Sequence, residues 1–208
     1  MVEAMFDPAH LGGERIRPLL RREYELLVEN GELVDERVEL LRGVLVEMRP
    51  QGTAHSRITA WFAQYLSKAL DFDRYDVRAH SPFAATDDSE PEPDVSVSLR
   101  TRRDEHPSKV LLLIEIANSS VVKDRTIKTE IYAQAGVPEY WIVDLRHDSI
   151  DVLTAPTRAG YQHVERVDAV TVVPRALPGI AIHVADIPWL RAGDDDFTPR
   201  PKRSKRRR

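Results

Sequence analysis

The chain has 208 residues, of which 42% are hydrophobic and 31% charged, a composition typical of an ordinary globular protein. It contains no cysteine, which excludes a disulfide framework and a thiolate zinc site. No apolar run is long enough to span a bilayer, and residues 1–10 lack the basic start and apolar stretch of a signal peptide. We therefore expect a cytoplasmic protein that has one substantial core and no membrane contact.

The net charge of −4 hides an uneven distribution of charge along the chain. Positions 200–208 hold seven basic residues and no acidic one: Arg200, Lys202, Arg203, Lys205, Arg206, Arg207 and Arg208. Without these seven, 23 of the 30 basic residues remain against 34 acidic ones, a net charge of −11. The basic end suits binding to nucleic-acid phosphates, although a disordered solubilising end has the same composition. The acidic body suits a site that recruits divalent cations.

The first third of the chain predicts a helix, a hairpin and a second helix. Apolar residues at helical spacing predict a helix over residues 18–30, which Gly31 ends. Alternating apolar residues over 37–48, with a turn at Arg42-Gly43, predict a β-hairpin. An amphipathic pattern predicts the second helix over residues 53–70.

Short strands and an acidic loop follow. We expect strands near residues 74–79 and 82–85, then a proline-broken acidic loop over 87–93. This loop leads to Asp94, at the head of a strand over 94–99. Alternation along this strand predicts one apolar and one polar face.

Residues 109–144 carry the clearest pattern in the chain. An unbroken apolar run over 110–114 is typical of a strand buried on both faces, and Glu115 follows it directly. Residues 118–120 offer an N-cap for a helix of about four turns, and Gly136 ends that helix. A second apolar strand over 140–143 completes a βαβ unit, which predicts parallel strands and a right-handed crossover.

The remainder of the chain predicts further strands. The candidates at 149–154, 161–167, 169–173 and 180–184 suggest an antiparallel extension of the sheet. A last short helix is expected over 186–190. No repeat or composition shift marks a second domain.

Three residues have side chains suited to hydrolysis of phosphodiesters with a divalent metal. Asp94 and Glu115 supply carboxylates, and Lys128 lies on the predicted helix that connects the two strands of the βαβ unit. The carboxylate of Glu115, beside a buried strand, needs a cation, a metal or several hydrogen bonds to offset its desolvation. Two of these residues also have a structural interpretation: Asp94 as a turn or cap residue, Lys128 as part of a solvated helix face.

Several short motifs in these segments resemble those of one family. They are Pro93-Asp94-Val95, then Ile-Glu-Ile-Ala-Asn-Ser-Ser over 114–120, then Asp-Arg-x-x-Lys-x-x-x-Tyr-Ala-x-Ala-Gly-Val-Pro-Glu-Tyr-Trp-Ile-Val-Asp over 124–144. Upstream lie Glu-Leu-Leu-Arg-Gly at 39–43 and His55. The likeness covers residues 20 to 190 and is to the Uma2 family, formerly a domain of unknown function, assigned to the PD-(D/E)XK nuclease superfamily.

The resemblance implies an α/β (α+β) fold with a restriction-endonuclease-like core. Its mixed central sheet would be flanked by helices, and its acidic residues would lie at one edge of the central strands. We expect an N-terminal segment over residues 1–17, a single domain over 18–192 and a flexible tail over 193–208. Related nuclease folds commonly dimerise, so a homodimer is an expected form.

The resemblance also implies roles for residues. Asp94 and Glu115, with the backbone carbonyl of Ile116, would hold Mg²⁺ or Mn²⁺. The superfamily's lysine belongs two residues after the second acid, where this chain has Ala117, and Lys128 would replace it from the helix. Asp124, Lys128 and Tyr132 share one face of that helix by their spacing.

Two further residues have open assignments. Glu39 would complete the metal shell, hold a second ion, or simply pair with Arg37 or Arg42. His55 would contact phosphate, act as a general acid–base, or cap its helix. Tyr132 and Trp141 are expected to be core aromatics rather than surfaces for base stacking.

The sequence thus favours a metal-dependent nuclease that acts on DNA and needs no small-molecule cofactor. One alternative is a nucleic-acid-binding protein on the same fold that is catalytically weak or inactive, because Ala117 replaces the expected lysine. Another is a structural or regulatory dimer, in which the candidate residues are dispersed or satisfied by internal salt bridges.

Overall fold

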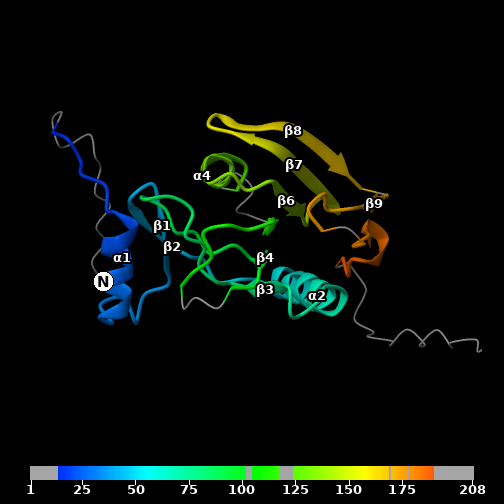
Figure 1. Ribbon diagram of the computed structural model, residues 1–208, viewed down its shortest axis with the longest axis horizontal. Helices are drawn as coiled ribbons and strands as arrows, with labels where there is room; N and C mark the ends of the chain where they lie inside the picture. Colours follow the sequence, from blue (N-terminus) through cyan, green and yellow to red (C-terminus); the bar gives the residue numbers. More distant parts are fainter. Residues whose placement is uncertain (1–13, 102–104, 118–123, 169, 178, 190–208) are drawn as a thin grey trace, which may run out of the picture.

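A mixed six-stranded sheet lies at the centre of the computed structural model, which describes residues 14–101, 105–117, 124–168, 170–177 and 179–189 (Figure 1). In spatial order its strands are β3 (Tyr75–Ala79), β4 (Val95–Leu99), β5 (Leu112–Ala117), β6 (Glu139–Asp144), β7 (Ser149–Thr157) and β8 (Gly160–Val167). Only β5 and β6 run parallel, and every other neighbouring pair is antiparallel. The predicted mixed sheet with an antiparallel extension is confirmed for β7 and β8.

Apolar side chains cover both faces of the central strands. Helix α2 (Thr53–Ala69) packs Ile58, Phe62 and Leu66 into one core cluster, together with Ile114 and Ile116 of β5. Alternate residues of β5 face a second cluster with residues from β1 (Val38–Leu41) and α4 (Thr129–Gln134). Because successive strand residues point to opposite faces, every side chain of β5 is buried, including that of Glu115.

The predicted βαβ unit is present, with one local departure from regular geometry. A π-helical turn, η2 (Asp124–Lys128), precedes α4, and Gly136, with a φ of 72°, ends the helix as predicted. Strand β5 extends beyond the predicted run and contains Glu115, which pairs with Ile142 of β6. The predicted N-cap over 118–120 lies outside the described residues.

Helix α1 (Arg21–Glu29) packs against the antiparallel hairpin of β1 and β2 (Val44–Glu47) through a small apolar cluster. Arg42 and Gly43 both have positive φ, as the predicted two-residue turn requires. A side chain at position 43 would also meet Pro18, since a Cβ placed there lies 2.2 Å from the Pro18 Cβ. No helix among the described ranges has the length and apolarity needed to cross a membrane.

The strand predicted over residues 82–85 is wrong. This segment is irregular and makes single backbone bonds, from Phe83 N to Pro91 O and from Ala84 N to Pro107 O. Prolines supply carbonyl acceptors but no N–H donors, so the segment cannot form a two-way ladder with them.

Two other expectations need correction. Strands β9 (Thr171–Val172) and β10 (Ile182–His183) pair with each other in a separate small sheet rather than extending the main one. The short helix expected over 186–190 is instead a 3₁₀ turn, η3 (Val184–Asp186), since Pro188 disfavours helix at the residue before it. The alternation predicted for β4 is confirmed, because Val95 and Val97 pack into the first core cluster while Ser96 and Ser98 point to the other face, which is buried too.

Glu90 is a buried acidic residue behind the hairpin. It is 3% exposed, and its Oε2 has no hydrogen-bond partner among the described residues. The Arg21 guanidinium lies 4.0 Å from Oε2, and His106 Nε2 lies 3.9 Å from Oε1. Burial, reinforced by a hydrogen bond and negative charge from Glu25, raises the pKa of Glu90 from 4.5 to about 7.

The raised pKa of Glu90 predicts that this residue lowers stability as pH rises from about 4.5 through 7, because the folded state then holds a proton that the unfolded state has lost. Glu90→Gln should therefore stabilise the protein at pH 8 by on the order of 1–3 kcal/mol and have little effect near pH 4. Urea unfolding at both pH values measures this difference. Glu29→Gln, at an exposed position of α1, is the control. An equal effect of Glu90→Gln at both pH values would contradict the assignment.

Candidate active site

A cavity of about 650 Å³ opens between the hairpin, the start of α2, the ends of β4 and β5, and η2. All five candidate side chains from the sequence line it: Glu39, His55, Asp94, Glu115 and Lys128. The structure also places Gln51, His80 and Glu92 in its wall. The fold therefore brings together residues that are up to 89 positions apart in the sequence.

Asp94 lies where the pairing of β4 with β5 ends. Its Oδ2 accepts a 2.7 Å hydrogen bond from the backbone N–H of Ile116 and lies 3.1 Å from His55 Nε2. Its Oδ1 has longer contacts, 3.4 Å to Gln51 Nε2 and 3.5 Å to His80 Nδ1. The side chain is thus fixed to the neighbouring strand through one oxygen.

The strand geometry also directs the backbone carbonyl of Ile116. The N–H and C=O of one strand residue point to the same side, so this carbonyl faces β4, as the N–H does. Continuing the register of Val95 with Ile114 places Pro93 opposite Ile116. Proline has no N–H to donate to that carbonyl, so the proline before Asp94 leaves this position of the ladder without its usual donor.

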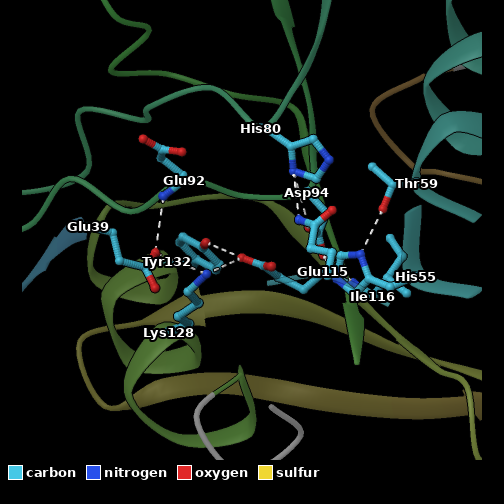
Figure 2. Close-up of polar contacts among 11 residues, drawn as sticks. Glu39, His55, Thr59, His80, Glu92, Asp94, Glu115, Ile116, Lys128 and Tyr132 are labelled. Carbon is cyan, nitrogen blue, oxygen red and sulfur yellow. Dashed lines mark hydrogen bonds and ion pairs between the residues drawn. The ribbon is translucent and has the colours of Figure 1, made fainter. Parts of the chain in front are cut away.

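Glu115 and Lys128 form a buried ion pair (Figure 2). Lys128 Nζ lies 2.8 Å from Glu115 Oε1 and 3.2 Å from Glu39 Oε2, and the lysine is 3% exposed. The Tyr132 hydroxyl donates a 2.7 Å hydrogen bond to the same oxygen of Glu115. One ammonium thus bridges two buried carboxylates, which offsets much of the desolvation that burial of these charges requires.

The helix supplies the cation that the strand lacks. Ala117, where the superfamily motif has its lysine, is fully buried in the same apolar cluster as Tyr132. Lys128 ends the π-helical turn and Tyr132 follows one turn later, so both reach Glu115 from one helix face as their spacing predicts. The side chain of Asp124, the third residue of that predicted face, lies outside the described part of the structure.

Glu39 and His55 have defined neighbours. Besides Lys128, Glu39 Oε2 accepts a 3.2 Å hydrogen bond from the backbone N–H of Glu92. Arg42 instead contacts Gln134 and Glu130. His55 lies between Asp94 and Thr59, whose Oγ1 is 3.4 Å from His55 Nδ1.

The sequence interpretation missed four contributors to this site. Tyr132 is a fully buried aromatic, as predicted, but its hydroxyl also binds Glu115. Gln51, His80 and Glu92 carry no sequence signal, because each lies outside the regular elements and is related to the site only by its neighbours in space. For Trp141 the prediction of a core aromatic is confirmed.

Burial and nearby charges shift the pKa values of several side chains in the site. Burial, with the charge of Glu115 adding to it, raises the pKa of Tyr132 well above 10, so the phenol keeps its proton and remains a donor. Burial also raises the pKa of Glu92, and the carboxylate of Glu39 adds to this effect. Burial lowers the pKa of His80, while Asp94 opposes the shift.

The candidate ligand atoms are oxygens, the element that hard divalent cations prefer. Two carboxylates and a backbone carbonyl at the end of β5 are oxygen ligands of the type that Mg²⁺ and Mn²⁺ prefer. Within the described residues no three acidic or histidine side chains converge as a ready ligand set. That is compatible with Mg²⁺, which is usually held by one or two carboxylates and keeps several waters for the substrate to displace.

A mixed sheet that brings two acids and a buried lysine to one cavity matches the restriction-endonuclease-like core that the sequence motifs imply. A family model described as "Uma2: Putative restriction endonuclease" matches residues 22–185, and the chain belongs to this family. Family membership supports a nuclease-like function.

The comparison with solved structures supports the fold. One similar chain, described as a putative nuclease belonging to DUF820 from Anabaena variabilis ATCC 29413, has 20% sequence identity and a TM-score of 0.57. The alignment covers 72% of this chain and 88% of that one. A comparison with curated proteins gave no match.

The buried ion pair predicts a large effect of removing its cation. Lys128→Met should destabilise the metal-free protein at pH 8 by about 3–5 kcal/mol, because Glu115 and Glu39 would remain buried without their counter-ion. Urea unfolding in EDTA measures the change. Lys68→Met, at an exposed position of α2, should stay within about 0.5 kcal/mol. Equal effects of the two substitutions would show that the bridging ammonium contributes no more than a surface lysine.

Proposed function

We propose that this protein is a metal-dependent endonuclease that hydrolyses phosphodiester bonds of DNA. One observation carries the proposal: Asp94, Glu115 and Lys128, from two strands and a helix, line the same cavity. Two acids and one cation at such a place match the residue types that metal-assisted phosphodiester hydrolysis uses. Membership of a family whose model is described as "Putative restriction endonuclease" supports the same reaction class.

The proposed ligands of Mg²⁺ or Mn²⁺ are Asp94, Glu115 and the backbone carbonyl of Ile116. A bound divalent ion would polarise a phosphate oxygen and lower the pKa of a water molecule. Ile116 N–H and His55 hold Asp94 in place through Oδ2. We therefore assign His55 first to positioning this carboxylate, with proton transfer as its alternative role.

Lys128 is the proposed electrostatic partner of the reaction. Its ammonium lies beside Glu115 and faces the cavity, where it would stabilise negative charge that develops on the phosphate. Glu39 holds this ammonium from the other side at 3.2 Å. We propose that Glu39 fixes Lys128 and that Tyr132 fixes Glu115, so that both charges keep one orientation.

The rival hypothesis is a nucleic-acid-binding or regulatory protein with an inactive site. It also accounts for an internal salt bridge such as that between Lys128 and Glu115. It does not account for Asp94 lying in the same cavity, with its carboxylate on the amide next to Glu115. This arrangement favours the nuclease.

Cleavage assays test the proposal directly. Supercoiled plasmid and single-stranded DNA are incubated with Mg²⁺, Mn²⁺ or EDTA, and wild type is compared with Asp94→Asn, Glu115→Ala and Lys128→Ala. We expect metal-dependent cutting that each substitution lowers by about a hundredfold or more. Glu130→Gln, at an exposed position of α4 outside the cavity, is purified in parallel and should cut like wild type.

Two outcomes would contradict this assignment. Cutting that persists in Glu115→Ala would place the chemistry elsewhere or in a contaminant. A wild-type protein that binds Mn²⁺ and DNA without cutting either substrate would favour the binding-protein hypothesis.

We also propose that the seven basic residues within 200–208 bind DNA phosphates. A chain ending at residue 199 should bind duplex DNA more weakly in EDTA, and the slope of its salt dependence should fall by about 0.9 for each phosphate that these residues neutralise. Fluorescence anisotropy over a range of salt concentrations measures both. A chain of full length with these seven residues replaced by serine controls for chain length, and should behave like the truncated one. Affinity unchanged by either alteration would contradict phosphate binding by this segment.

Oligomeric state is a separate part of the proposal. The family resemblance supports a homodimer, and light scattering coupled to gel filtration distinguishes it from a monomer of 23.7 kDa.

A further inference from the structure

Two histidines flank the carboxylate of Asp94, and they contact different oxygens of it. His55 Nε2 lies 3.1 Å from Oδ2, and His80 Nδ1 lies 3.5 Å from Oδ1. The two rings are nearly parallel, with centroids 6.5 Å apart and an interplanar angle of 20°. Their surroundings differ enough to separate their roles.

His55 is already occupied by protein partners on both ring nitrogens. Its Nδ1 faces the hydroxyl of Thr59 at 3.4 Å, and Thr59 is 2% exposed. Its Nε2 approaches the same Asp94 oxygen that accepts the Ile116 N–H. This chain of contacts from Thr59 to Asp94 orients the carboxylate.

His80 has different partners, at the mouth of the cavity. Its Nδ1 lies 3.2 Å from Gln51 Nε2, and this amide nitrogen is also 3.4 Å from Asp94 Oδ1. An amide NH₂ group only donates, so in the tautomer that accepts this contact His80 Nδ1 presents a lone pair to the same place as Asp94 Oδ1. The His80 nitrogen and the Asp94 oxygen, each with a lone pair, therefore converge on the position that the Gln51 amide group occupies through two long contacts.

The separation of these two donors suits a shared cation better than a direct hydrogen bond. Neighbouring ligands of an octahedral ion with bonds of about 2.1 Å lie about 3 Å apart. The observed 3.5 Å between His80 Nδ1 and Asp94 Oδ1 is close to this value. The His80 side chain is 37% exposed, so an ion from solvent can reach it.

The backbone of His80 is a second, independent observation. Its φ is 47°, in the left-handed region, directly after β3 ends at Ala79. Its N–H still donates to the Asp94 carbonyl at 3.2 Å, so the ladder with β4 continues through a turned residue. Such conformations are uncommon outside glycine, although histidine is among the residues enriched there, and they gather at functional sites.

We propose that His80 Nδ1 and Asp94 Oδ1 are ligands of the site's divalent cation, which takes the position of the Gln51 amide group. The inference rests on Asp94 as a ligand of the proposed metal site and adds one nitrogen ligand beside it. Within the described residues no third acidic or histidine side chain converges with these two, so water would complete the shell. Because Mg²⁺ favours oxygen ligands and imidazole suits transition metals, this ligand makes the site selective for Mn²⁺ over Mg²⁺. The selectivity is then a property of one residue.

Metal binding to the purified, metal-free protein tests the inference without any activity readout. Pulsed electron paramagnetic resonance of the MnCl₂-loaded protein detects coupling from a directly bound ¹⁴N nucleus. We expect imidazole coupling in wild type that His80→Ala removes and that His55→Ala retains. Competition titration should show the affinity ratio of Mn²⁺ to Mg²⁺ falling by about tenfold or more in His80→Ala.

The control variants separate the possible failures. His163→Ala, at an exposed position of β8, should keep both the coupling and the affinity ratio. If Mn²⁺-loaded wild type shows no ¹⁴N coupling while Asp94→Asn abolishes Mn²⁺ binding, the His80 inference fails and the proposed metal site stands. Coupling that His55→Ala removes and His80→Ala retains would also overturn the inference. Unchanged Mn²⁺ binding in Asp94→Asn would overturn the proposed metal site itself.

Discussion

A single buried ammonium, that of Lys128, is the interaction on which the candidate site depends. Glu115 belongs to a strand that is buried on both faces and is itself 4% exposed, so bulk water solvates its carboxylate little. Lys128 and Tyr132 donate to one of its oxygens, and Glu39 shares the ammonium. Burial of such a group of charges is stable only when every partner is in place. The hairpin, the central strand and the helix are therefore held in one arrangement by charge as well as by apolar packing.

Asp94 is held in a different way, at the position where the pairing of β4 with β5 ends. The Ile116 N–H donates to the carboxylate of Asp94, where a continued strand ladder would offer it a backbone carbonyl. Each acid is thus fixed by two donors on one oxygen, Asp94 from the backbone and His55, Glu115 from Lys128 and Tyr132. Both acids line one cavity and are oriented before any ligand arrives, which is the form of preorganisation that electrostatic catalysis requires.

The parts of this arrangement that were predictable from sequence are those that depend on local pattern. The apolar run before Glu115, the helix stop at Gly136 and the spacing of Lys128 from Tyr132 each act within a few residues. The strand expected over 82–85 failed because its neighbours in space are prolines, which the local pattern does not include. The pairing of β9 with β10 likewise depends on the core that they cover, rather than on their own alternation.

Gln51 and His80 were beyond local pattern for a more specific reason. Each follows or precedes a regular element by one or two residues, and neither has a spacing that relates it to Asp94. What brings them together is the antiparallel register of β3 with β4, which sets His80 opposite Asp94, and the left-handed turn of His80. A register is a property of two strands, so the sequence of either one alone does not contain it. The position of the site's lysine shows the same principle. Lys128 reaches Glu115 from the helix of the βαβ unit, while Ala117, two residues after Glu115 in the sequence, contributes only packing.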